Sequence, residues 1–121
     1  MKKPLVSVLM PAYNAEKYIA EAIESILNQT YENFELIIAD DASTDKTWSI
    51  ICNYNNNDKR IVAVRNNKNL YIAGNRNKLV SLARGKYIAW QDADDISYRK
   101  RLERQVNLWK KTRMLGFVGG T

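Results

Sequence analysis

The chain has 121 residues, of which 45% are hydrophobic and 26% are charged, as is typical of one globular domain with a single core. It has no histidine and one cysteine, Cys52, which excludes an internal disulfide and leaves carboxylates, hydroxyls and the backbone for any chemistry. No apolar run approaches the roughly 20 residues of a membrane-spanning helix. Cys52 is expected to be a small buried residue, and the cysteine usage favours a reducing, cytoplasmic compartment.

The first half of the chain alternates between apolar runs and helical patterns. Leu5–Met10 is a nearly continuous apolar run that ends at Pro11, which predicts a strand buried on both faces rather than a signal peptide. Apolar residues at three- and four-residue steps predict a helix over 18–27, with Asn14 as its cap. A second buried strand is predicted at Phe34–Ala39.

The alternation continues to the end of the chain. A second helix is predicted along 48–52 with Ser43 or Thr44 as its cap, and a loop at Asn53–Arg60 follows it. The remaining predicted elements are strands at Ile61–Val64 and Tyr87–Trp90, a helix at Ala73–Ala83 that Gly85 ends, a fourth helix with Leu102, Val106 and Trp109 on one face, and a fifth strand at Leu115–Val118.

Strand and helix alternating four times predict an α/β fold: a mostly parallel sheet with helices on both faces, in one domain over residues 1–121. Right-handed crossovers leave a crevice at the carboxyl ends of the strands, which is where ligands bind in such sheets.

Acidic residues follow two of the predicted strands. They are Asp40, Asp41, Asp92, Asp94 and Asp95. If these five carboxylates share one crevice, their repulsion must be relieved by protonation or by a cation, and oxygen ligands favour Mg²⁺ or Mn²⁺. Such an ion can hold a nucleotide diphosphate, with Tyr13 flanking the base and a strand-two carboxylate accepting a hydrogen bond from the base or ribose.

Each of these features also has a purely structural interpretation. Asp40 and Asp41 also suit a turn or a helix cap, and the acids at 92–95 suit a helix N-terminus. Tyr13 also suits a packing position. The three features are expected at one edge of the sheet, and this coincidence favours a binding site.

Four ordered blocks carry a resemblance to a known family. They are Val6–Asn14; Gln29–Tyr31 with Phe34–Ile38 and Asp40–Asp45; Asn69, Gly74, Arg76 and Asn77 with Ala83–Ile88; and Asp92–Asp95. Together they resemble family 2 glycosyltransferases of the GT-A fold, the last block matching the Asp-X-Asp signature. Each block is weak evidence alone, whereas the ordered set covers nearly the whole chain.

The resemblance implies a nucleotide-sugar donor, usually a UDP-sugar. Pro11, Ala12 and Tyr13 would line the nucleoside pocket, and Asp41 would bind the base, usually uracil. Arg76 would contact the diphosphate.

The resemblance also implies a metal, Mg²⁺ or Mn²⁺. Asp94 would be its principal ligand, and Asp92 would face the ribose or the metal. The usual reaction inverts the anomeric centre and builds surface polysaccharides, glycolipids or glycoproteins, so the acceptor is a saccharide, lipid or protein. The family's acceptor-binding half and catalytic base are expected after Thr121, and this part alone is expected to bind the donor but to transfer sugar poorly.

One segment carries the whole excess of positive charge. The net charge of the chain is +6, and segment 97–113 holds seven basic residues and one acidic residue. A solvated helix face is the favoured explanation, and the alternative is contact with an anionic acceptor or with anionic lipid at the inner face of the membrane. No motif supports binding to nucleic acid.

Two other enzyme or signalling classes share a similar arrangement of acids. A receiver-type Mg²⁺-binding domain needs an acid after the third strand, where this chain has Val64-Arg65-Asn66. A nucleotidyltransferase usually has a glycine-rich basic loop after the first strand, where this chain has no glycine. A dehydrogenase would need a Gly-x-Gly-x-x-Gly motif after a strand, which is also missing.

Overall fold

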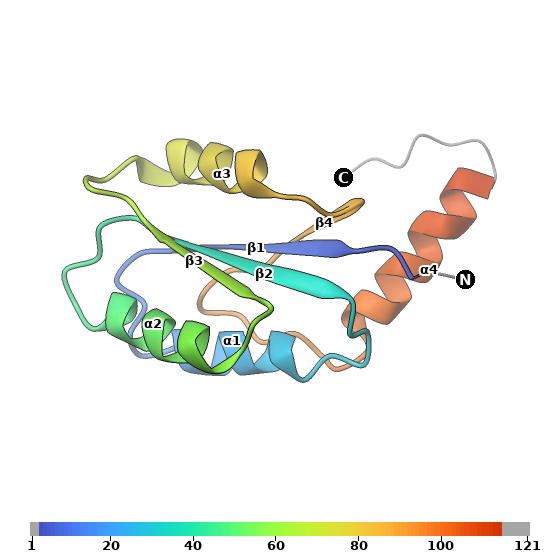
Figure 1. Cartoon of the computed structure of the whole chain (residues 1–121), viewed down its shortest axis with the longest axis horizontal. Helices are drawn as coiled ribbons and strands as arrows, with labels where there is room; N and C mark the ends of the chain where they lie inside the picture. The colour runs from blue at the N-terminus through green and yellow to red at the C-terminus, as the bar shows by residue number, and fades with distance from the viewer. Residues whose placement is uncertain (1–2, 115–121) are drawn as a thin grey trace.

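The computed structural model describes residues 3–114 and has four strands and four helices in strict alternation (Figure 1). They are β1 (Val6–Ala12), α1 (Ile19–Leu27), β2 (Phe34–Asp40), α2 (Thr47–Asn57), β3 (Ile61–Arg65), α3 (Tyr71–Leu82), β4 (Tyr87–Trp90) and α4 (Arg101–Met114). The fifth strand expected at 115–118 lies outside the described residues. Within those residues, no helix has the length and apolarity needed to cross a bilayer.

All four described strands are parallel, and their order across the sheet is β3-β2-β1-β4. The chain therefore adds strands on one side of β1 and then crosses to the other side to add β4. The crevice of a parallel sheet lies where the strand order reverses, and here that point is the carboxyl end of β1.

Helices cover both faces of the sheet, as the alternating pattern predicts. Figure 1 shows α1 and α2 on one face and α3 on the other. The larger core lies between the sheet and α1, α2 and α4, and its α4 members are Leu102 and Val106. The smaller core joins Leu79 of α3 to Leu9 and Ile37 of the sheet.

Strand β2 shows why the buried runs are so continuous. All seven of its residues are buried, because Leu36 and Ile38 face the larger core while Ile37 and Ala39 face the smaller one. A strand covered on both faces has no solvent-facing side, so the polar alternation of an exposed sheet is missing from its sequence.

Helix α2 extends into the segment predicted to be a loop, so that prediction is wrong for residues 53–57. Asparagines have low helix propensity, which made this segment look like a loop. Tyr54 packs partly buried against the larger core, and its hydroxyl donates to Glu24 of α1. These tertiary contacts outweigh the local preference. Cys52 in the same helix is half-buried rather than fully buried.

The three predicted helix boundaries differ from the structure in their caps. Asn14 does not cap α1; it adopts a positive φ of 46°, and its side chain accepts the Thr44 N–H. Asp45 accepts the Thr47 N–H at the start of α2, in place of Ser43 or Thr44. Helix α3 ends at Leu82, and Gly85 instead allows a close approach to β1: a Cβ there would be 2.6 Å from the Ser7 nitrogen.

Candidate functional site

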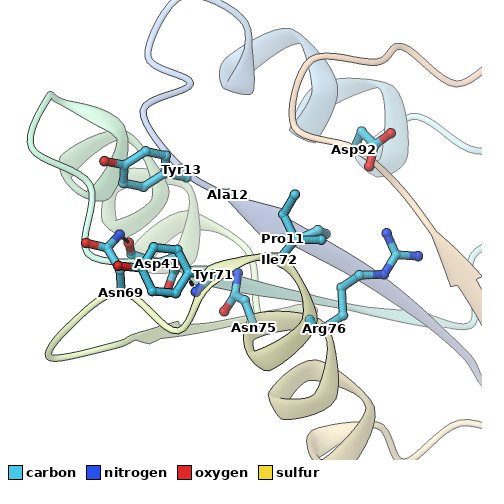
Figure 2. A pocket seen from close by; sticks show the side chains of 11 residues that line it. Pro11, Ala12, Tyr13, Asp41, Asn69, Tyr71, Ile72, Asn75, Arg76 and Asp92 are labelled. Carbon is cyan, nitrogen blue, oxygen red and sulfur yellow. Dashed lines mark hydrogen bonds between the residues drawn. The ribbon is translucent and has the colours of Figure 1, made fainter.

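A cavity of about 880 Å³ opens at the carboxyl ends of β1, β2 and β4. Its walls come from the end of β1, the residues after β2 and β4, and the first turns of α3 (Figure 2). The lining residues are Pro11, Ala12, Tyr13, Asp41, Asn69, Tyr71, Ile72, Ala73, Asn75, Arg76 and Asp92. All six residues predicted to bind the nucleotide therefore line one cavity.

Asp41 is held as a buried carboxylate in the wall of this cavity. Its side chain accepts the N–H groups of Leu70 and Tyr71 at 2.7 and 2.9 Å and the amide of Asn66 at 2.8 Å. Burial by itself raises the pKa of the Asp41 carboxyl, but these hydrogen bonds outweigh it and hold the pKa below its ordinary value. Asp41 is therefore an ionised acceptor at neutral pH.

A second layer of polar side chains fixes the partners of Asp41. Asn66 also donates to Asn75 at 2.9 Å, and Asn75 donates to the Ala39 carbonyl at 3.0 Å. The Lys78 ammonium donates to Asn66 at 2.9 Å. This network orients the Asn66 amide so that its N–H group, not its oxygen, faces the carboxylate.

Asp40 does not reach the cavity, and this corrects the expectation that five carboxylates share one crevice. Its side chain is fully buried in the turn between β2 and α2. There it accepts the Ser43 hydroxyl and lies 3.4 Å from the Arg65 guanidinium. Successive residues at a strand end point to opposite faces, so Asp40 and Asp41 separate.

The acids after β4 form a compact, exposed cluster. One carboxylate oxygen from each of Asp92, Asp94 and Asp95 lies within 4.8 Å of the other two. Asp94 lines a neighbouring cavity, and Pro11, Tyr13 and Asp92 belong to both that cavity and the larger one. Asp41 and Asp94 thus line two neighbouring cavities that have wall residues in common.

The side chain of Gln91 anchors the loop that carries this cluster. The Gln91 amide donates to the carbonyls of Asp92 and Asp95 at 3.1 and 2.7 Å. Its oxygen accepts from the Arg101 guanidinium at 2.9 Å, and Arg101 also donates to the Trp90 carbonyl at 2.7 Å. The side chains of Gln91, directly after β4, and of Arg101 at the start of α4 therefore set the backbone of the acidic loop.

Arg76 lies at the end of the cavity away from Asp41. Figure 2 shows its guanidinium on the same side as Asp92, while Tyr13 and Tyr71 lie near Asp41. The Arg76 guanidinium carbon is 4.1 Å from the centre of the Trp90 ring, a distance that suits a cation–π contact. This contact holds a positive charge beside the acidic loop.

Comparison with known proteins gives the family. The model of the family described as Glycosyl transferase family 2 matches residues 7–121. The chain belongs to this family. Its membership decides against the receiver-type and nucleotidyltransferase alternatives.

Two curated relatives illustrate the similarity of this family 2 chain. It is 50% identical over 115 residues to an uncharacterized glycosyltransferase of Methanocaldococcus jannaschii, covering 93% of the chain and 40% of the relative. It is 43% identical over 103 residues to WfaP of Escherichia coli, named UDP-Glc:alpha-D-GlcNAc-diphosphoundecaprenol beta-1,3-glucosyltransferase, covering 85% of the chain and 40% of the relative. The chain thus spans about 40% of the length of these relatives.

Solved structures confirm a GT-A-like fold. Residues 1–349 of S. aureus TarS in complex with UDP-GlcNAc match with a TM-score of 0.82 and 29% identity, covering 89% of this chain and 32% of that one. A mannosyltransferase from Pyrobaculum calidifontis in complex with GDP-Man and Mn²⁺ matches with a TM-score of 0.73 and 27% identity, covering 78% of this chain and 29% of that one.

Several residues around the family 2 site were missed by sequence reasoning. They are Asn66, Asn69, Tyr71, Ile72, Asn75, Lys78, Gln91 and Arg101. The sequence pattern predicts no strand or helix over 66–69 and starts the third helix at Ala73, after Tyr71 and Ile72. The available signal was the concentration of asparagines beside a turn, because buried asparagines usually support hydrogen-bond networks.

Proposed function

We propose that the chain is the donor-binding part of a glycosyltransferase that uses a UDP-sugar. The observation that carries the proposal is the cavity that joins Asp41 at one end to Arg76 and Asp92 at the other. A nucleoside diphosphate has the matching order of groups: a base with N–H donors, a ribose and an anionic diphosphate.

In this proposal the base binds at the Asp41 end, between the residues after β1 and those of α3. The Asp41 carboxylate accepts an N–H of the base, as uracil provides, and Tyr13 flanks the ring. Pro11 and Ala12 form the floor. The UDP-GlcNAc complex of TarS and the UDP-Glc donor in the name of WfaP support a uridine nucleotide.

The other end suits a divalent cation and the diphosphate. The donor set consists of exposed carboxylate oxygens, which Mg²⁺ and Mn²⁺ prefer, and the cluster is compact enough to share one ion. Asp94 and Asp92 would hold the ion, which would neutralise charge on the departing diphosphate. Arg76 contributes a second positive charge there. The Mn²⁺ complex of the related mannosyltransferase supports this assignment.

The reaction that follows is transfer of the sugar to an acceptor saccharide, lipid or protein, with inversion, in the synthesis of a surface polysaccharide or glycoconjugate. The name of WfaP, whose acceptor is a diphosphoundecaprenol-linked sugar, supports a lipid-linked saccharide. The catalytic base and the acceptor site stay predictions for residues after Thr121.

The proposal is tested by thermal unfolding with UDP and Mn²⁺. A ligand at 100 times its Kd stabilises the folded chain by about 2.7 kcal/mol, which raises the melting temperature by several degrees. Asp94→Ala should abolish the part of the shift that needs Mn²⁺. Glu32→Gln, which removes one exposed carboxylate elsewhere, should keep it.

Failure of every common nucleotide diphosphate to shift the unfolding transition, with or without metal, would overturn the donor site. An equal loss of the shift in Asp94→Ala and Glu32→Gln would instead overturn the metal assignment, since general charge would then explain the effect.

We also propose a cytoplasmic protein that meets the inner face of the membrane through α4. Arg104, Lys110 and Lys111 of α4 are exposed, as is Lys100 just before the helix, whereas Arg101 is engaged with the acidic loop. Exposed basic side chains attract anionic lipid headgroups.

A further inference from the structure

Tyr71 combines a strained backbone with an exposed ring. Its φ is 63°, in the left-handed region that glycine adopts without cost and that a bulky residue rarely adopts. The hydrogen bonds to Asp41 explain this backbone: the Leu70 and Tyr71 N–H groups reach the same carboxylate at 2.7 and 2.9 Å. A turn of this shape aims two consecutive N–H groups at one acceptor.

The hydrogen bonds to Asp41 explain the positive φ at position 71, but they do not explain why the residue there is a tyrosine. Glycine would give the same turn without strain, and the Tyr71 ring adds nothing to either core because it is 76% exposed. Residues held in such sparsely populated backbone conformations cluster at active sites and ligand-binding sites.

The position of the ring indicates that function. Tyr71 and Tyr13 both line the cavity, and Figure 2 shows the Tyr71 ring beside Asp41 and Asn69. The exposed fraction of Tyr13 is 52%, so two accessible aromatic rings flank one buried acceptor of N–H groups. Aromatic rings on both sides of an N–H acceptor suit a planar heterocyclic base.

We propose that Tyr71 is a nucleoside-binding residue whose ring packs against the base that Asp41 holds, opposite or beside Tyr13. The inference rests on the proposed donor site and adds a contact to it. The strained backbone at position 71 lowers the stability of the fold, and it places an aromatic ring in the nucleoside pocket.

The test separates stability from binding in a set of single variants. Tyr71→Gly relieves the strain and removes the ring, so the melting temperature of the free chain should rise by a few degrees while UDP affinity falls about tenfold. Tyr71→Phe keeps both strain and ring and should match the parent chain in both measurements. UDP affinity is measured by calorimetry in the presence of Mn²⁺.

Ala42→Gly is the matched control. Ala42 follows Asp41, has a φ of 59°, and does not line the cavity. Its replacement should raise the melting temperature similarly and leave UDP affinity unchanged.

Two outcomes overturn the inference in distinguishable ways. Equal UDP affinity in Tyr71→Gly and Ala42→Gly would show that the ring does not contact the base, while the donor site itself survives. Absence of UDP binding by the unchanged chain would overturn the donor site and this contact together.

Discussion

Asp41 shows how single residues acquire their chemistry from neighbours far away in sequence. Three N–H groups stabilise its charge, and one comes from Asn66, which Asn75 and Lys78 orient in turn. A carboxylate kept ionised inside a wall accepts hydrogen bonds and cannot donate them. In the proposed nucleoside pocket, Asp41 would therefore favour a base edge that presents an N–H group over one that presents a lone pair.

The first prediction concerns the pH dependence that Asp41 adds to stability. Its pKa in the folded chain lies below the unfolded value of about 3.9, so its contribution is complete above that pH and is lost as pH falls toward the folded pKa. Asp41→Asn should cost about 2 kcal/mol at pH 7, since the amide turns a donor toward a backbone N–H.

Urea unfolding of both proteins at several pH values measures this difference. The gap between parent and variant should be constant from pH 5 to 7 and should shrink below about pH 4. Other acids titrate in both proteins and cancel. A gap that stays constant at low pH would contradict the role given to the Asp41 charge.

At the scale of elements, α4 acts on the site through the loop after β4. The Arg101 guanidinium joins the Trp90 carbonyl, Gln91 and Ser97 with bonds of 2.7, 2.9 and 2.9 Å. Burial lowers the pKa of Arg101 from its ordinary value, but the group keeps its proton. The first residue of the helix thereby positions the backbone at the start of the acidic loop.

The second prediction is that Arg101→Lys loosens this loop although it preserves the charge. A lysine ammonium cannot reproduce the planar fork of three bonds, so we expect a loss of about 1–2 kcal/mol in unfolding free energy. Apparent Mn²⁺ affinity in the presence of UDP should fall as well.

Arg104→Lys is the control on the same helix. Arg104 is exposed and lies 5.7 Å from the Tyr98 ring, so its replacement should change stability by less than about 0.5 kcal/mol. Equal effects of the two substitutions on Mn²⁺ affinity would mean that Arg101 does not act through the loop.

At the scale of the molecule, the cavity and the excess of positive charge lie in different parts of the fold. The strand order places the cavity at the switch point of the sheet, whereas the basic excess lies on α4 and the residues before it. The acidic loop joins these two regions. The proposed donor site and the basic segment therefore occur on one small fold without sharing residues.

The third prediction follows from that basic surface. The chain should bind vesicles that contain anionic phospholipid, not neutral ones, and should be released by salt, because each basic residue near such a surface contributes about 1 kcal/mol. Replacing Lys110 and Lys111 with Glu should abolish sedimentation with the vesicles. The same change at Lys59 and Lys68, which are exposed outside α4, should have a smaller effect. Equal losses would mean that only net charge matters.

The sequence by itself determined the order and type of the elements. Buried strands such as Phe34–Asp40 and helices such as Ile19–Leu27 follow from the spacing of apolar residues, which depends only on near neighbours. The residues at the strand ends, including Asp41 and Asp92, were also predictable, because parallel strands bring their carboxyl ends to one edge.

Only the tertiary structure decided which of these residues meet. The buried Asp40 carboxylate pairs with the partly exposed Arg65 while Asp41 faces the cavity, and the partners of Asp41 come from a turn 25 or more residues later in the chain. The strain at Tyr71 belongs to the same contacts. The physical reason is that a crossover fixes distances between distant residues, and no local pattern encodes these distances.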